Sequence, residues 1–164
     1  MRSAKPRKRA FGLCAAKPNG RWRLGRKGSG GDRDLAQVFF ANGEGFLPRD
    51  HPADPRDGRD ICYATAIAAE LAPKAFLLSQ GWDDDRCRRE VRHDLETGLL
   101  CARAEGLDAP RALDDVLGVL NIYYPKHAFD RFVLPAGDET FPTTSRIVVA
   151  DLFDRVRPHV EAGP

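Results

Sequence analysis

The first 31 residues contain ten Lys or Arg residues and no Asp or Glu. Residues 1–10 also show no apolar periodicity, so the start of the chain offers no face for a hydrophobic core. The remaining residues hold 16 basic and 24 acidic side chains, because the whole chain has 26 and 24. The net charge of +2 therefore hides a segment of +10 followed by a body of −8. We predict a basic arm over residues 1–31 and a single compact domain over residues 32–164.

The arm itself has two interpretations. Its turn-forming "KPNG" sequence separates Phe11–Ala16 from Arg21–Leu24, where Trp22 and Leu24 alternate with arginines. Such alternation is typical of a half-buried strand, which favours a short basic β-hairpin. The alternative is an arm that is disordered throughout. Glycines and charges over Gly25–Asp34 predict a flexible linker between arm and body.

The body is predicted to begin with strands. Leu35–Ala41 is an apolar run, and the Asn42-Gly43 dipeptide after it favours a tight turn back into a second strand. Residues 48–60 are rich in Pro, Asp and Gly, which predicts a loop. The expected class is therefore α+β, with a mostly helical body and a small antiparallel β element near the N-terminus.

Helical signals follow the loop. Asp60 can cap a helix over Ile61–Leu71, whose apolar residues on nearly all sides predict burial. A long helix is expected over Asp85–Ala104, with Gly106 ending it in a left-handed conformation. The apolar seam of this long helix recurs at helical spacing and comprises Cys87, Val91, Leu95, Gly98, Leu99 and Ala102.

Two more helices are predicted near the C-terminus. Asp108 is expected to cap the first, with Pro110 in its first turn. The apolar face of that helix consists of Leu113, Val116, Leu117 and Leu120. The second is expected over Val148–Val156 and to stop at Pro158.

The cysteines and the apolar runs bound the class of protein. Cys14, Cys62, Cys87 and Cys101 form no C-x-x-C pair, so we interpret them as reduced thiols of a cytoplasmic protein. No apolar segment follows the basic start as in a secretory signal, and the longest apolar runs are shorter than a membrane span. Motifs for ATP, GTP or NAD are missing, so no cofactor and no membrane contact are expected.

The composition of the arm favours binding to DNA or RNA. Each Lys or Arg that neutralises a phosphate releases a counterion, and an aromatic ring can stack on an unpaired base. The predicted nucleic-acid-binding residues are Arg2, Lys5, Arg7, Lys8, Arg9, Arg21, Trp22, Arg23, Arg26 and Lys27. Two alternatives remain: a solvated tail, or an arm that docks on the acidic body of its own chain.

Cys62 is the candidate nucleophile of a second interpretation. It lies in "DICYATAIAAEL", where the start of a buried helix would stabilise a thiolate. This stretch resembles the nucleophile helix of papain-like and ovarian-tumour-type thiol hydrolases. The resemblance implies a histidine base, for which His127 follows in the right chain order, with Asp130 or Asp151 orienting it. Asp60 beside the thiol would work against this activation.

Two further patterns favour ordinary helices over sites. "ARAEGLDAPRALDDVL" resembles a helix-turn-helix motif, but Asp114 and Asp115 in its second helix would repel phosphate, which favours a helical hairpin. Glu90 and His93 have the spacing of half a di-iron carboxylate site, and the second half is missing from the sequence. No metal site is expected.

The charge asymmetry is a signal from ten residues. The thiol site, in contrast, depends on the pairing of Cys62 with His127, which their spacing in the sequence does not require. We therefore predict a small soluble accessory or regulatory protein, without catalytic activity. It would contact DNA or RNA through its basic arm and a protein partner through its acidic helical body. The alternative is a thiol hydrolase that uses Cys62 and His127, with Asp151 as the orienting carboxylate.

Overall fold

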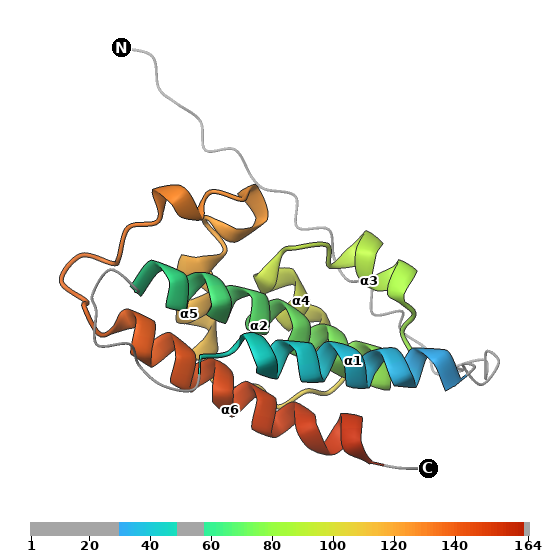
Figure 1. Cartoon of the computed structure of the whole chain (residues 1–164). Coiled ribbons are helices and arrows are strands. Elements are labelled where there is room, and N and C mark those ends of the chain that lie inside the picture. The colour runs from blue at the N-terminus through green and yellow to red at the C-terminus, as the bar shows by residue number, and fades with distance from the viewer. Residues whose placement is uncertain (1–29, 49–57, 163–164) are drawn as a thin grey trace.

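The computed structural model describes residues 30–48 and 58–162, and all regular elements in these ranges are helical (Figure 1). The helices are α1 (Gly30–Phe46), α2 (Gly58–Ser79), α3 (Asp84–Glu90), α4 (Leu95–Ala104), α5 (Leu113–Leu120) and α6 (Phe141–Glu161). Two short 3₁₀ helices, η2 (Tyr124–Lys126) and η3 (Phe129–Arg131), lie between α5 and α6. The predicted α+β class is therefore wrong, because the described residues form an all-α fold. The alternative β-hairpin of the arm lies outside the described residues.

Helix α2 forms the centre of the bundle and packs against α1, α4, α5 and α6. Figure 1 shows α1, α2 and α6 side by side, with α1 running opposite to the other two. The predicted helix Ile61–Leu71 is confirmed but too short at both ends. Helix α2 begins at Gly58, so Asp60 lies in its first turn and does not cap it, and α2 continues across Pro73 to Ser79. Tertiary packing explains the extension: Pro73 and the apolar residues after it are buried, which offsets the backbone hydrogen bond that proline removes.

The length of α2 bears on the expected absence of a membrane span. Two apolar runs join in this helix of 22 residues, which is long and apolar enough to cross a membrane by length and composition. In the bundle, however, 78% of its most apolar window is buried. The core helix of a soluble protein can be equally long and apolar, so the length and composition of α2 do not by themselves assign it to a membrane.

Helix α1 replaces the predicted strand Leu35–Ala41 and the turn at Asn42-Gly43. Ala36, Phe40 and Gly43 are buried at helical spacing, while Val38 is 50% exposed. The ring of Phe40 meets that of Phe153 on α6 edge to face, with centroids 5.3 Å apart. The strand prediction is wrong because aromatic and β-branched residues favour strands locally, whereas packing against α2 and α6 selects a helix. Helix α1 also begins at Gly30, inside the predicted linker.

Gly43 serves close packing between helices instead of a turn. A Cβ atom at this position would lie 2.6 Å from Cζ of Phe153 and 3.1 Å from Cβ of Leu71. Since Phe153 is buried against Phe40, its ring has no room to move away. We therefore expect Gly43→Ala to lower the free energy of unfolding by about 1–3 kcal/mol, measured by urea denaturation.

Gly45 in the same helix is the matched control, because a Cβ there would meet nothing within 4 Å. Gly45→Ala should leave stability unchanged or raise it by up to about 0.5–1 kcal/mol, through helix propensity alone. A Gly43→Ala variant as stable as Gly45→Ala would contradict the packing of α1 against α6.

The predicted long helix Asp85–Ala104 is interrupted. Helix α3 ends at Glu90, Arg92 adopts a positive φ of 56°, and α4 begins after Asp94. The Asp94 side chain accepts a hydrogen bond from the Thr97 amide at 2.9 Å, so it caps α4 instead of continuing one helix. The predicted seam is nevertheless confirmed, because all its residues are buried. Gly106 has a φ of 101°, as predicted for a left-handed helix end.

The last two helices have different ends from those predicted. Helix α5 begins at Leu113, and Asp108 does not cap it, since its carboxylate instead accepts a hydrogen bond from Arg155 at 2.8 Å. Its predicted apolar face is buried as expected. Helix α6 is longer than Val148–Val156 and includes Pro158, because a proline in the last turn removes only one backbone hydrogen bond before the helix ends at Glu161.

Candidate functional site

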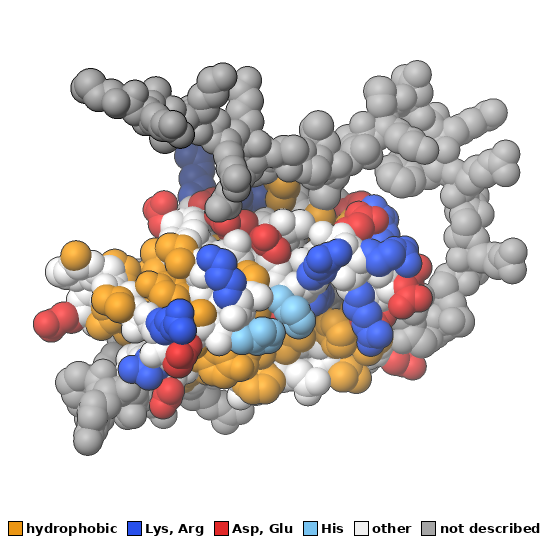
Figure 2. Space-filling model, turned by 90° about the horizontal axis from the view of Figure 1, so that it is seen from above, with side chains coloured by type: hydrophobic (Ala, Val, Ile, Leu, Met, Phe, Trp, Pro, Cys, Tyr) orange, Lys and Arg blue, Asp and Glu red, His pale blue; other side chains and the backbone are white. Residues whose placement is uncertain are grey.

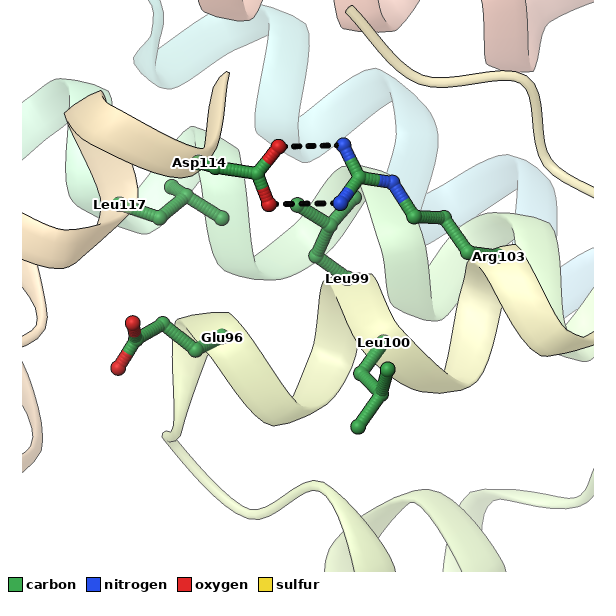
Figure 3. A pocket seen from close by; sticks show the side chains of 6 residues that line it. All are labelled: Glu96, Leu99, Leu100, Arg103, Asp114 and Leu117. Carbon is green, nitrogen blue, oxygen red and sulfur yellow. Dashed lines mark hydrogen bonds and ion pairs between the residues drawn. The ribbon is translucent and has the colours of Figure 1, made fainter. Parts of the chain in front are cut away.

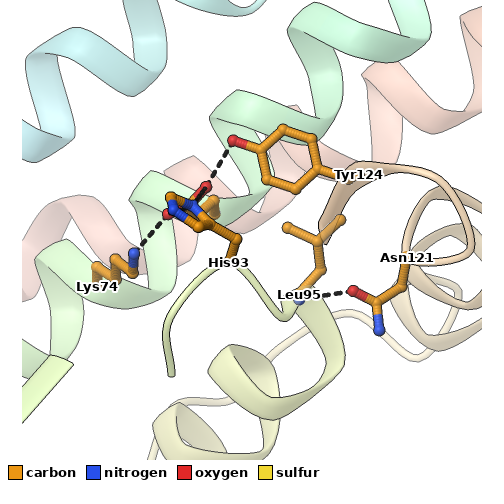
Figure 4. Close-up of polar contacts among 6 residues, drawn as sticks. Lys74, His93, Leu95, Asn121 and Tyr124 are labelled. Carbon is orange, nitrogen blue, oxygen red and sulfur yellow. Dashed lines mark hydrogen bonds and ion pairs between the residues drawn. The ribbon is translucent and has the colours of Figure 1, made fainter. Parts of the chain in front are cut away.

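Glu70 is a buried carboxylate at the centre of a polar cluster. Its side chain, on α2, is 8% exposed and forms a buried ion pair with Lys74, one turn further along the helix. Tyr124 Oη donates to Glu70 Oε2 at 2.5 Å, and His93 Nδ1 lies 3.0 Å from Oε1 and 3.2 Å from Oε2. Figure 4 shows these side chains converging from three parts of the chain. We call Glu70, Lys74, His93 and Tyr124 the Glu70 cluster.

The interruption between α3 and α4 brings His93 to Glu70. Arg92 turns the chain through its positive φ, and Asp94 caps α4, so His93 lies between two fixed points. Asn121 holds the start of α4 from the other side, because its Oδ1 accepts from the Leu95 amide at 2.8 Å (Figure 4). Tyr124 reaches the same carboxylate from η2. The cluster therefore ties α2, the α3–α4 interruption and η2 together.

Opposing influences set the ionisation of the cluster. Burial alone would raise the pKa of Glu70, but the hydrogen bonds from Lys74, Tyr124 and His93 outweigh it and lower that pKa. Burial and the adjacent Glu70 carboxylate both raise the pKa of Tyr124, which therefore stays a neutral donor. The result is a charged carboxylate and a charged ammonium that neutralise each other below the surface.

His93 is the member of the cluster whose side chain is exposed at the surface. Its side chain is 59% exposed, although Nδ1 is held by Glu70. When Nδ1 donates to the carboxylate, Nε2 is left to accept or donate a proton or to bind a ligand. The ring of His127 lies beside it, with centroids 6.1 Å apart. In the described part of the chain, no group of three potential metal-ligating side chains comes together.

Most of this cluster has no signature in the sequence. His93 has the helical spacing to Glu90 of half a metal site, but Glu90 instead pairs with Arg86 at 3.1 Å. One signal was present: Glu70 and Lys74 lie four residues apart in an otherwise apolar helix, which indicates a buried ion pair. The contact to Tyr124, 54 residues further on, has no local signal.

The three residues of the predicted thiol site have different partners in the structure. Cys62 is fully buried on α2 and forms a hydrogen bond with Ser145 of α6. His127 is exposed and faces His93. Asp151 is exposed on α6 and lies 3.4 Å from Arg155. None of these contacts joins the thiol to the imidazole or the imidazole to the carboxylate. Asp130, the other orienting candidate, lies 3.8 Å from Arg131.

The surroundings of Cys62 oppose nucleophilic chemistry. Burial raises the pKa of its thiol to about 12, and the hydrogen bond with Ser145 offsets this only in part. Cys87 is also buried, and burial raises its pKa to about 11. Both environments are typical of structural cysteines.

A surface pocket between α4 and α5 offers little for ligand recognition (Figure 3). Leu99, Leu100 and Leu117 line it. Its charged residues are already paired: Arg103 forms two hydrogen bonds with Asp114, at 2.6 and 2.8 Å, and Glu96 accepts from Asn121. The pair between Arg103 and Asp114 also joins α4 to α5, as in the helical hairpin that the sequence favoured over a helix-turn-helix motif.

All ten predicted nucleic-acid-binding residues, from Arg2 to Lys27, lie outside the described residues. Comparisons of the chain with models of protein families, with curated proteins and with solved structures find no match.

Proposed function

We propose that this protein is an accessory or regulatory protein that binds DNA or RNA through the basic residues of its first 27 positions. The supporting observation is the charge of this segment, which holds all ten of the Lys and Arg residues before Gly31 and no carboxylate. Several Lys or Arg side chains that contact neighbouring phosphates release counterions together, which produces strong and salt-dependent binding. Trp22 adds a ring on which an unpaired base can stack.

The competing interpretation is that the basic segment docks on the acidic body of its own chain. Many carboxylates of the body, however, already have basic partners within the body. Glu44 pairs with Arg157 at 2.5 Å, and Asp114 forms a bidentate pair with Arg103. Further such pairs are Glu70 with Lys74, Asp84 with Arg88, Glu90 with Arg86, Asp108 and Asp151 with Arg155, and Glu161 with Arg157. Because these carboxylates already have partners, the segment would have to displace body arginines or lysines to reach them, and an external polyanion requires no such exchange.

The helical body is proposed to contact a protein partner. Its net charge of −8 disfavours nucleic acid over the body as a whole, so we assign the main nucleic-acid contact to the first 31 residues. Several large apolar side chains are exposed on the body, among them Leu100 and Ile147 at 55% and Val133 at 69%. Apolar side chains in contact with water are what a protein interface buries.

A full-length variant with glutamine at each of the ten basic positions tests the nucleic-acid half of the proposal. We expect this variant to bind single-stranded and duplex oligonucleotides at least about 100-fold more weakly than the natural chain at low salt, because its phosphate contacts are gone. Fluorescence anisotropy with labelled oligonucleotides measures the change.

The matched control changes exposed basic residues of the body. Arg88, Arg89 and Arg111 are exposed in α3 and before α5, and their replacement by glutamine should change affinity by less than about threefold. Equal losses in the two variants, or unchanged binding in the ten-residue variant, would contradict the proposal.

A further inference from the structure

Two exposed imidazoles lie together: His93, which belongs to the Glu70 cluster, and His127 beside it. The rings of His93 and His127 have centroids 6.1 Å apart and planes inclined by 63°. Figure 2 shows histidine side chains in contact on this face, with Lys or Arg side chains on both flanks. Arg92 and Lys126 are the exposed chain neighbours of the two histidines, and neither has a carboxylate partner among the residues that the structure describes.

Backbone strain marks the same place. Arg92 has a φ of 56° and His127 a φ of 52°, and within the described residues no other non-glycine residue has a positive φ. An L residue pays a free-energy cost for this conformation, which persists only where the surrounding structure enforces it. Such residues are concentrated at functional sites. Here both of them lie at the pair of imidazoles, although they are 35 positions apart in the chain.

His93 is held through its side chain, and His127 through its backbone. Glu70 binds Nδ1 of His93 and is itself fixed by Lys74 and Tyr124, so the free nitrogen of His93 is Nε2. His127 follows η2 directly, and its amide donates to the Tyr124 carbonyl at 3.1 Å. Arg92 is fixed at its amide, which donates to the Cys87 carbonyl at 3.0 Å. The backbone at both positions and the His93 ring are therefore set before any ligand arrives, which lowers the ordering cost of binding.

The local charge favours an anion. Lys74 neutralises the Glu70 carboxylate below the surface, and Arg92 and Lys126, the chain neighbours of the two histidines, add two exposed positive charges. Asp94 is engaged by the Thr97 amide and by Asn121, at 2.9 and 3.2 Å. The groups that contact the imidazoles or lie next to them in the chain are Glu70 and Tyr124 at His93, with Arg92 and Asp94 as its chain neighbours, and Lys126 before His127. Asp130 and Arg131 follow His127 in η3 and lie 3.8 Å from each other.

We propose that His93, His127, Arg92 and Lys126 form a binding site for a phosphate group. The two imidazolium rings would donate hydrogen bonds to its oxygens, and the Arg92 and Lys126 side chains would neutralise its remaining charge. His93 donates through Nε2 only when it is protonated, since Glu70 already takes the proton on Nδ1. Binding is therefore linked to proton uptake and tightens as the pH falls. This site does not depend on the basic residues before Gly31.

Titration of the full-length protein with inorganic phosphate and with sulfate, followed by imidazole ¹H–¹⁵N correlation spectra, tests the proposal. Each histidine reports separately, so binding by the first 27 residues does not obscure the result. We expect saturable shifts at His93 and His127 and none at His159, which packs against Phe76 on another part of the surface. Affinity for sulfate, whose charge is constant in this range, should rise as the pH is lowered from about 8 to about 6.

Two variants separate binding from folding. Asparagine tolerates a positive φ, so His127→Asn removes the imidazole without adding strain, and Arg92→Gly removes both the guanidinium and the strain. Each should retain the helical circular dichroism of the natural chain and bind phosphate about tenfold more weakly. His159→Gln and Arg111→Ala are the matched controls, and their affinities should stay within about twofold of the natural chain.

The same variants show whether the site binds a terminal phosphate monoester or a phosphate of the nucleic-acid backbone. If His127→Asn weakens a 5′-phosphorylated oligonucleotide more than its 5′-hydroxyl counterpart, the site takes a phosphate monoester, and equal weakening indicates backbone phosphate. Shifts spread equally over His93, His127 and His159 would overturn the proposal. So would His127→Asn and Arg92→Gly variants that bind inorganic phosphate as the natural chain does.

Discussion

Replacement of Glu70 by leucine is expected to lower the free energy of unfolding by about 3–5 kcal/mol, because it leaves the buried Lys74 ammonium without its partner. The hydroxyl of Tyr124 and Nδ1 of His93 lose their acceptor in the same variant. Urea denaturation followed by circular dichroism measures the loss.

A double variant is the matched control. Glu70→Leu combined with Lys74→Met removes both charges, and apolar side chains of similar size fit the same interior, so most of the lost stability should return. Tyr124→Phe removes a single hydrogen bond and should cost only about 1 kcal/mol. A single variant Glu70→Leu as stable as the natural chain would contradict the burial of this ion pair.

The contribution of Glu70 to the free energy of unfolding also depends on pH and decreases as the pH is lowered. The folded state lowers the pKa of Glu70, so the stabilisation is fully present above the pKa of an unfolded glutamate, about 4.3. It is lost as the pH falls through the lower, folded value. The natural chain should therefore lose more stability between about pH 5 and pH 3 than the double variant does.

Alkylation of Cys62 by iodoacetamide is expected to be at least about 10³ times slower in the folded protein than in the unfolded chain. Burial raises the pKa of its thiol from 9.0 to about 12, which lowers the thiolate fraction near neutral pH by that factor. The side chain is also inaccessible, with an exposed fraction of 0%. Mass spectrometry of the Cys62 peptide over time measures the rate.

The same experiment in urea provides the reference rate for each cysteine. Cys87 is buried too, and because burial raises its pKa from 9.0 to about 11, its labelling should be slowed by at least about 10². Rapid labelling of Cys62 alone in the folded protein would contradict the structural role of this thiol and would revive the thiol-hydrolase interpretation.

Helix positions were predictable where the local pattern and the packing agree. The seam from Cys87 to Ala102 has helical spacing, and the bundle buries it as expected. Gly106 ends its helix because only a residue without a Cβ adopts a φ of 101° at little cost. In α1 the local pattern and the packing disagree. Local preferences favoured a strand at Leu35–Ala41, whereas Phe40 and Gly43 pack against other helices that no local window contains.

The candidate site was less predictable, for a related reason. Asp94 can extend a helix or cap one, and the structure selects the cap, which places His93 against Glu70. The cluster joins residues up to 54 positions apart, so its geometry arises only after α2, the α3–α4 interruption and η2 have packed. Only the i,i+4 spacing of Glu70 and Lys74 was visible in the sequence.

The slope of log affinity against log salt for the full-length protein and a single-stranded oligonucleotide tests the proposed function most directly. Simultaneous contacts of about five to ten basic residues with phosphates predict a slope of about −3.5 to −7. A slope between 0 and about −1 would mean that few of the ten Lys and Arg side chains contact phosphate, and would contradict binding of nucleic acid through the first 27 residues.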